Sequence, residues 1–345
     1  MTKDKTPTPF KALQRKANFM KIIFMGSPDF ATPTLDALVK SNHEILAVYS
    51  QPPRPAGRGQ KIKPTPVHQL AQGHHLSVCV PEKLTPEEVD NILAQKPDLI
   101  VVVSYGLILP ESLVNSVTCI NLHPSALPLW RGAAPMNYPI LHGATKTDIC
   151  IMQMEKGLDT GPVYLRKSYT IGADETAGEL HDRLKKTGAE LMLEVVNNWS
   201  HYHDQAIPQQ GETTYAHKFT TSELPTLRPI DFGQPAQEIH NKIRGLSPWP
   251  GATITHNSNE IKVLKSTLTA NKDDSLLCIM DELKTQNSEN QPQIGQVMHI
   301  DGTAVWIQTK TDIIGLQVLQ RSGKRALPVS EFVAGYSLKV GDIFK

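Results

Sequence analysis

Short apolar runs alternate with amphipathic stretches over the first half of the chain. The runs predict buried strands at residues 22–25, 44–49, 98–104 and 119–122. The run at 98–104 contains Leu-Ile-Val-Val-Val, which is typical of a central parallel strand covered on both faces. A helical stretch follows the first strand, with Phe30, Leu35 and Leu38 on one side. The alternation predicts an α/β fold with a doubly wound, mostly parallel, Rossmann-like sheet, whose ligands lie beyond the carboxyl ends of the strands.

The pattern changes after about residue 148. Two further strands are expected at 149–154 and 163–170, followed by a long amphipathic helix at 176–198 that begins with a capping box of Thr176 and Glu179. Residues 201–228 are polar, contain several prolines and show no sustained periodicity. A helix at 235–246 then precedes short strand-like runs at 251–255, 261–264, 296–299, 304–308 and 313–318. Such runs, separated by turns, predict a small antiparallel barrel or sandwich, and an OB-like β-barrel is the architecture that we expect.

Length and composition agree with two domains. The chain has 345 residues, 39% of them hydrophobic, which suffices for two cores. We expect a first domain at 20–204, a linker at 205–227 and a C-terminal domain at 228–345. No apolar run approaches the ~18 residues that a membrane span needs, so we expect no membrane contact.

Charge and cysteine content exclude several classes of protein. The 35 Lys and Arg residues nearly balance 34 Asp and Glu residues, and the net charge of +1 argues against a generally basic nucleic-acid binder while leaving a local basic patch open. The four cysteines are scattered without a Cys-x-x-Cys pair. We therefore expect reduced thiols, with neither a disulfide framework nor a structural zinc site.

The first nineteen residues differ from the rest of the chain. They carry five Lys or Arg residues against a single acid, Asp4, and they lack the apolar region of a secretory signal. Met20 directly precedes the first strand. Residues 1–19 therefore suggest a disordered basic tail or a non-native extension from an upstream start codon, and an organellar presequence is the less favoured alternative.

Asn121 and His123 are the first candidates for chemistry. They stand two apart at the end of a strand, so their side chains share one face. An Asn amide can hold a developing oxyanion, and a His can donate a proton near neutral pH. A lone Asn-x-His is nevertheless more often an ordinary strand end with a solvated His, so this pair needs further support.

That support comes from a resemblance to the folate-dependent formyltransferases. The sequence Asn-Leu-His-Pro-Ser-Ala-Leu-Pro, followed by Arg-Gly, is similar to the family motif, and Asp159 lies in a Gly-Leu-Asp-Thr-Gly turn like that of the family. Further similar blocks occur in the same order at residues 51–61, 105–110, 130–135 and 151–154. The resemblance extends from about residue 20 to the C-terminus, and it is strongest to members that formylate methionine carried on initiator tRNA.

The resemblance implies a catalytic trio of Asn121, His123 and Asp159 that acts on 10-formyltetrahydrofolate without a metal. Asn121 would hydrogen-bond the formyl oxygen as it becomes an oxyanion. His123 would stabilise the tetrahedral species and help the folate N10 to leave. Asp159 would orient His123 and accept the proton of the attacking amine.

The family's folate-binding residues fall on two segments. The tetrahydrofolate loop corresponds to Ser125, Ala126, Leu127 and Pro128, and the wall of the pterin pocket corresponds to Tyr105 and Gly106. Ala126 stands where the family usually has Leu, and Leu129 where it usually has Arg, so the loop loses some apolar contact and one charge.

The resemblance also implies that initiator tRNA is a partner. Residues 51–68 contain Arg54, Arg58, Lys61 and Lys63 without any acid, and their many prolines and glycines predict a loop without regular structure. A solvated basic loop is the simplest interpretation, but the resemblance identifies this stretch with the loop that grips the acceptor stem. Further tRNA contacts are implied at Lys218, Lys324 and Arg325, although the linker around Lys218 is longer than in the family.

Alternatives remain at this point. The nearest is a folate-dependent formyltransferase or hydrolase that acts on a sugar-nucleotide amine or a purine precursor, and another is a non-catalytic tRNA-binding protein on a decayed enzyme fold. NAD binding is disfavoured because Gly26-Ser27-Pro28 lacks the Gly-x-Gly-x-x-Gly motif. We expect a monomeric enzyme of translation initiation in the bacterial cytoplasm, with an organelle as the second choice.

Overall fold

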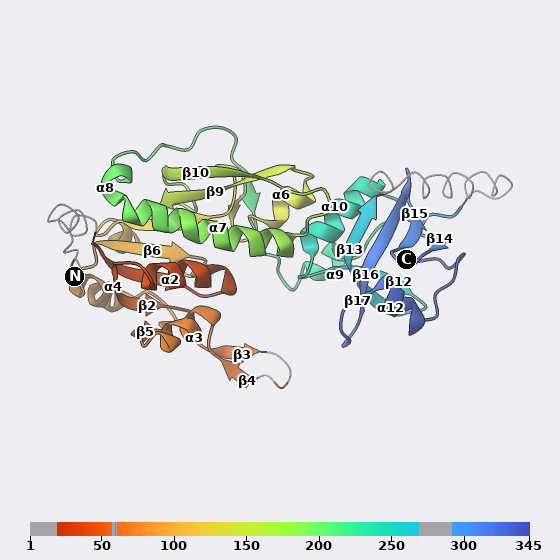
Figure 1. The fold of residues 1–345 in the computed structure, drawn as a ribbon, viewed down its shortest axis with the longest axis horizontal. Helices are drawn as coiled ribbons and strands as arrows, with labels where there is room; N and C mark the ends of the chain where they lie inside the picture. The colour runs from red at the N-terminus through yellow and green to blue at the C-terminus, as the bar shows by residue number, and fades with distance from the viewer. Residues whose placement is uncertain (1–18, 57–58, 60, 269–291) are drawn as a thin grey trace, which may run out of the picture. The chain divides into compact units, whose positions relative to one another are not determined.

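The computed structural model describes residues 19–56, 59, 61–268 and 292–345. The chain divides into two compact units (Figure 1). The first consists of Met1–Gly132, Asp148–Tyr169 and His181–Tyr215, and the second of Ala133–Thr147, Thr170–Leu180 and Ala216–Lys345. Arg58 and almost all of the N-terminal tail, residues 1–18, lie outside the described residues.

A seven-stranded, mostly parallel sheet forms the first unit. Its order is β10 (Val163–Thr170), β9 (Lys146–Gln153), β7 (Cys119–His123), β6 (Leu99–Val103), β1 (Lys21–Gly26), β2 (Glu44–Tyr49) and β5 (Val78–Cys79). β1 pairs in parallel with both β2 and β6, and β6 pairs in parallel with β7, whereas β9 runs antiparallel to β7. Every residue of β6 and β7 is buried, as expected of central strands. The predicted α/β architecture is confirmed.

Helices accompany this sheet, and the local sequence explains where two of them begin. They are η1 (Asp29–Ala31), α2 (Thr32–Val39), α3 (Pro66–Gly73), α4 (Pro86–Ala94), α5 (Glu111–Val114), α7 (Ala177–Asn197) and α8 (Trp199–Tyr202). α3 and α4 each begin with a Thr N-cap followed by Pro, and Thr65 and Thr85 accept hydrogen bonds from the backbone three residues on. Among the described residues, no helix has the length and apolar character that crossing a membrane requires.

The basic stretch at 51–68 is more ordered than the sequence predicts. Arg54–Ala56 (β3) and Lys61–Lys63 (β4) pair as an antiparallel hairpin, and α3 follows from Pro66. The expectation of an irregular loop is therefore wrong here, because Pro55 lies in a two-stranded ribbon, where a missing N–H is tolerated.

The second unit contains a sheet of antiparallel strands. Its order is β12 (Ala252–His256), β13 (Asn259–Leu268), β16 (Ile313–Arg321), β15 (Val305–Gln308) and β14 (Val297–Ile300), and β17 (Leu327–Pro328) pairs with β16. Helices α6 (Asn137–Leu141), α9 (Leu224–Leu227), α10 (Ala236–Leu246) and α12 (Val329–Ala334) accompany it. Ile239, Ile243 and Leu246 of α10 pack into the buried core that the strands form. Every predicted strand and the predicted helix of this half are present.

The segment expected as a linker carries short elements of its own. β11 (Tyr215–Ala216) forms a two-stranded sheet with β8 (Arg131–Gly132). Earlier in the segment, Ile207 forms an antiparallel bridge with Val163 at the start of β10. This part of the chain is therefore held against the first unit at defined points.

Candidate active site

β7 places Asn121 and His123 at the carboxyl edge of the first sheet. Their side chains point to the same face because strand residues alternate, and the residues are 9% and 4% exposed. Asn121 pairs with Val102 on one side and Met152 on the other, so both neighbouring strands fix its position. The strand therefore delivers an amide and an imidazole to one edge with little freedom to move.

His123 lies between two acceptors. Its Nδ1 is 3.6 Å from Oδ2 of Asp159, and its Nε2 is 3.2 Å from the carbonyl oxygen of Trp130. The structure thus brings His123 and Asp159 together, as the resemblance implies, and adds a backbone carbonyl on the other side of the ring. The two contacts fix the plane of the imidazole.

Asp159 is held by its own turn and by the loop opposite. Its φ of 52° is left-handed, a conformation that Asp adopts more readily than most residues. Oδ2 accepts a hydrogen bond from the backbone N–H of Gly132 at 2.8 Å. The carboxylate therefore faces His123 with one of its oxygens already oriented.

The loop after β7 contains the four predicted folate-binding residues and is fixed by internal contacts. The Ser125 hydroxyl, which is fully buried, donates to the carbonyl of Leu129 at 2.7 Å, and the Cys150 thiol donates to the carbonyl of Ser125. Leu127 is buried in a small apolar cluster with Cys150, and the guanidinium of Arg166 donates to its carbonyl. Ala126 is partly exposed and Pro128 is buried. The loop is therefore preorganised by the protein itself.

Tyr105 and Gly106 lie just after β6, at the same edge of the sheet. Tyr105 is 2% exposed, its carbonyl accepts a hydrogen bond from the Ser27 hydroxyl at 3.0 Å, and burial raises the pKa of its phenol. Gly106 has a φ of 85°, which a side chain would strain. The amide nitrogen of Gln51 is buried next to this position, and no described residue accepts a hydrogen bond from it.

The predicted tRNA-binding residues are distributed over both units. In the first, Arg54 on β3 lies directly opposite Lys63 on β4, and Lys61 is two residues away on the same strand. In the second, Lys218, Lys324 and Arg325 are exposed, and Arg325 pairs with Glu331 at 2.8 Å. Like charges in directly paired positions destabilise a hairpin. The Arg54–Lys63 pair therefore lowers the stability of this hairpin, and a surface that contacts only water has no need of such a pair.

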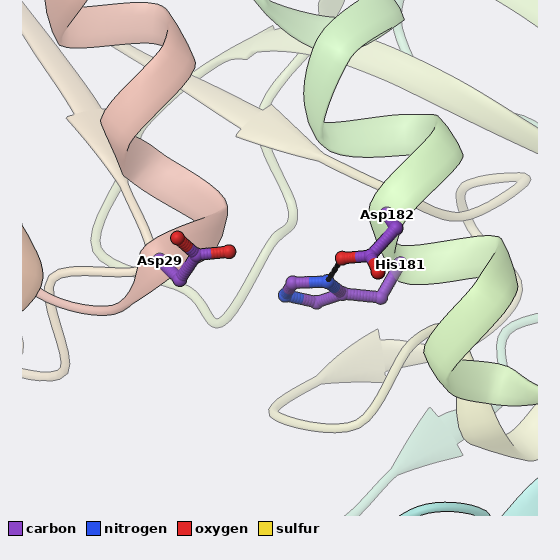
Figure 2. A group of neighbouring side chains, drawn as sticks. All are labelled: Asp29, His181 and Asp182. Carbon is purple, nitrogen blue, oxygen red and sulfur yellow. Dashed lines mark hydrogen bonds and ion pairs between the residues drawn. The ribbon is translucent and has the colours of Figure 1, made fainter.

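One group of side chains has the chemistry of a metal site, away from the predicted catalytic trio. Asp29, His181 and Asp182 lie close together, Asp29 at the start of η1 and the other two within α7 (Figure 2). Lys185 already supplies a cation there, since its ammonium pairs with both Asp29 and Asp182. These hydrogen bonds raise the pKa of Lys185 and keep it charged. The cluster is therefore neutralised by the protein and points to no metal.

Sequence reasoning missed several residues that contact the trio. Trp130 contacts His123 through its backbone carbonyl, and a pattern of side chains in the sequence cannot reveal a backbone contact. Gln209 and Thr214 contact the same region from the polar segment after α8. A single Gln or Thr in a stretch without periodicity carries no signal of a tertiary contact.

Comparisons with known proteins identify the family. Residues 20–196 match the family described as "Formyl transferase", and residues 225–337 match "Formyl transferase, C-terminal domain". The chain is 42% identical over 325 residues to the methionyl-tRNA formyltransferase of Ruegeria pomeroyi, and 39% identical over 328 residues to that of Alkaliphilus oremlandii. These alignments cover 93% and 94% of this chain and 99% of each relative.

A solved structure shows the same fold at low sequence identity. WlaRD, a sugar 3N-formyl transferase crystallised in the presence of dTDP and 5-N-formyl-THF, aligns with a TM-score of 0.59 and 18% identity. The alignment covers 89% of this chain and 99% of WlaRD. Fold and sequence agree: the chain belongs to the methionyl-tRNA formyltransferases, a family of formyl-transferring enzymes.

Proposed function

We propose that the chain transfers the formyl group of 10-formyltetrahydrofolate to the α-amino group of methionine on initiator tRNA, for translation initiation. The observation that carries the proposal is the His123–Asp159 pair beside Asn121 at the carboxyl edge of the sheet, in a chain of this family. A paired acid and base next to an amide donor is the set of groups that acyl transfer to an amine needs.

Each residue of the trio has one role in this reaction. The amine nitrogen attacks the formyl carbon, and the carbonyl electron pair moves to oxygen, where the amide of Asn121 donates a hydrogen bond to the oxyanion. The Asp159 carboxylate accepts the proton that the amine loses. When the intermediate collapses, the bond between the formyl carbon and N10 breaks, and N10 takes a proton from His123. A proton relayed from Asp159 to His123 through solvent then restores both groups.

The folate is proposed to lie along the loop after β7. Ser125, Ala126, Leu127 and Pro128 shape that loop, and Tyr105 and Gly106 flank it at the end of β6. The left-handed Gly106 leaves room for a flat ring to approach the backbone, and the Gln51 amide offers it a donor. None of these steps calls for a metal.

The tRNA is proposed to contact basic residues of both units. The hairpin presents Arg54, Lys61 and Lys63 together, and Arg58 lies in the same stretch of sequence outside the described residues. An anionic backbone relieves the repulsion between these cations, and the attraction is salt-dependent. Lys218, Lys324 and Arg325 extend the proposed contact to the second unit.

The domain organisation of the proposal follows the family. A catalytic domain at 20–204 is followed by a linker at 205–227 and an OB-like barrel at 228–345. Backbone hydrogen bonds of the last residues support the barrel. Lys345 bonds to Thr255 within β12, and Phe344 bonds to Gly295, which lies just before β14. The C-terminal residues thus connect the two edge strands of the sheet. We further propose that the enzyme acts as a monomer in the bacterial cytoplasm.

One experiment separates the proposal from its rivals. Purified protein is incubated with 10-formyltetrahydrofolate and, in parallel, methionyl initiator tRNA, methionyl elongator tRNA, amino-sugar nucleotides or free amines. Formylation of the initiator tRNA alone supports the proposal. Transfer to a sugar amine would identify a different formyltransferase, and tRNA binding without turnover would identify a non-catalytic binder. Light scattering of the same sample tests the monomer.

A further inference from the structure

Residues 207–214 cross the active-site side of the first unit as a strap anchored at both ends. At one end, Ile207 and Val163 exchange two backbone hydrogen bonds of 2.8 and 2.9 Å. At the other end, the Thr214 hydroxyl accepts from the N–H of Trp130 at 2.9 Å, and the Thr214 carbonyl accepts from the N–H of Arg131 at 3.0 Å. The strap therefore contacts both β10 and the loop whose Trp130 carbonyl faces His123.

Gln209 lies near the first anchor of this strap, and both ends of its side-chain amide form hydrogen bonds. Its Nε2 donates to the carbonyl oxygens of Asp159 and Gly161, each at 2.8 Å. Its Oε1 accepts from Nη2 and Nε of Arg131 at 2.7 and 3.2 Å. Carbonyls only accept and a guanidinium only donates, so the orientation of the amide is unambiguous. One side chain thus joins the Asp159 turn to the loop on the other side of His123.

The Asp159 turn is a place where such support matters. Asp159 has a left-handed backbone, and a Cβ at Gly161 would lie 2.0 Å from the carbonyl oxygen of Gln153, so the turn is tight. Asp159 Oδ2 and His123 Nδ1 are already 3.6 Å apart, so a further increase in this distance would weaken the ion pair. A displacement of about 1 Å at a reacting group can cost about 10²-fold in rate.

We propose that Gln209 is a positioning residue for Asp159 in formyl transfer. Its two donated hydrogen bonds hold the backbone of the Asp159 turn, and its bonds with Arg131 set that turn at a fixed distance from the loop that bears Trp130. The inference rests on the proposed function, because it assigns a task to Gln209 within the same reaction.

Two substitutions separate the contacts of Gln209. Gln209→Met keeps the length of the side chain and removes all four hydrogen bonds. Gln209→Glu keeps the acceptor for Arg131 and removes the donors to the Asp159 and Gly161 carbonyls. We expect both variants to lower kcat by about 10- to 100-fold, with KM for tRNA and for folate changing by less than about threefold. Gln210→Met, at the exposed neighbouring position, is the matched control and should be unchanged.

A double-mutant cycle distinguishes positioning from a general structural role. In an Asp159→Asn background, Gln209→Met should lower kcat by less than about twofold, because the carboxylate that Gln209 positions is already absent. Single-turnover rates, corrected for the folded fraction from a denaturant titration, give these numbers.

Three outcomes overturn the inference when the wild-type protein formylates initiator tRNA. They are an unchanged kcat in Gln209→Met, a wild-type kcat in Gln209→Glu, or an equal loss from Gln209→Met in both backgrounds. A wild-type protein without formylation activity overturns the proposed function instead, so the two failures are distinguishable.

Discussion

His123 Nδ1 and Asp159 Oδ2 lie 3.6 Å apart, a separation that suits an ion pair and exceeds a direct hydrogen bond. The two side chains are only 5% and 13% exposed, so water screens the contact weakly. The other ring nitrogen faces the Trp130 carbonyl. Both ring nitrogens therefore face oxygen acceptors, and the imidazole is held in one orientation.

Asp159→Asn tests the value of this carboxylate. Asn keeps an oxygen for the Gly132 N–H but loses the charge beside His123 and the capacity to accept the amine proton. We expect kcat to fall by about 10²-fold or more, with the free energy of unfolding little changed. Steady-state formylation kinetics measure the effect, and Glu155→Gln, at an exposed position four residues earlier, is the control. Turnover within about threefold of wild type would contradict the role of Asp159.

Asn121→Ala tests the oxyanion donor. One such donor contributes ~3–4 kcal/mol to transition-state stabilisation, so turnover should fall by about 10²–10³-fold. Single-turnover formylation with saturating folate measures the loss. The exposed Asn115→Ala, at the C-cap of α5, should leave turnover unchanged. A folded Asn121→Ala protein with near-normal turnover would remove Asn121 from the mechanism.

Lys63→Glu tests the hairpin as a tRNA contact without unfolding it. The new carboxylate lies opposite Arg54, so the hairpin gains a cross-strand ion pair while its surface loses positive charge. KM for tRNA should rise about tenfold, and KM for folate should stay constant. The slope of the logarithm of the tRNA binding constant against the logarithm of the salt concentration should become shallower by about one. The exposed Lys83→Glu, outside the hairpin, controls for net charge. Equal changes in both KM values would argue against the contact.

Asp301 predicts a pH-dependent stability of the second unit. Burial alone would raise the pKa of Asp301, but hydrogen bonds from Thr303, the Trp306 indole and the backbone outweigh it and lower the pKa below its ordinary value of 3.8. A lowered pKa in the folded state stabilises the protein above about pH 4, and this contribution is lost as the pH falls through the folded-state value.

The matching experiment is urea unfolding of wild type and Asp301→Asn. At pH 7 the variant should lose about 1–2 kcal/mol of the free energy of unfolding, since charge-assisted hydrogen bonds are replaced by neutral ones. The difference should shrink only as the pH falls below 3.8 toward the lowered pKa of the folded state, where the wild-type carboxyl also becomes protonated. A difference that stays constant from pH 7 down to the acid-unfolding region would show that the charge of Asp301 does not matter.

Most of the fold was predictable because its central strands are buried and apolar and its long helix is regularly patterned. The run that became β6 is wholly apolar, and α7 begins with the reciprocal hydrogen bonds of its capping box, from Thr176 N–H to Glu179 and from Glu179 N–H to Thr176. The β3–β4 hairpin was missed because its strands have three residues each and one contains Pro55. Such short strands show no period, and their pairing is decided by neighbours in space.

The site was predictable only in part, for a related reason. Asn121 and His123 share a strand, so their spacing alone places them on one face. Asp159 came from the resemblance and not from any pattern around it. Gln209 lies 50 residues from Asp159, and its contact depends on how the segment after α8 returns to β10. No local sequence feature specifies that return.

The facing cations of the hairpin give salt two opposite effects on the same element. Small ions screen the repulsion between Arg54 and Lys63, and the same ions compete for the phosphates that these side chains attract. At low ionic strength the free hairpin is under most electrostatic stress while its affinity for an anionic partner is greatest. Its backbone amides should therefore exchange fastest in dilute buffer without nucleic acid, and slow when either salt or tRNA supplies the missing negative charge.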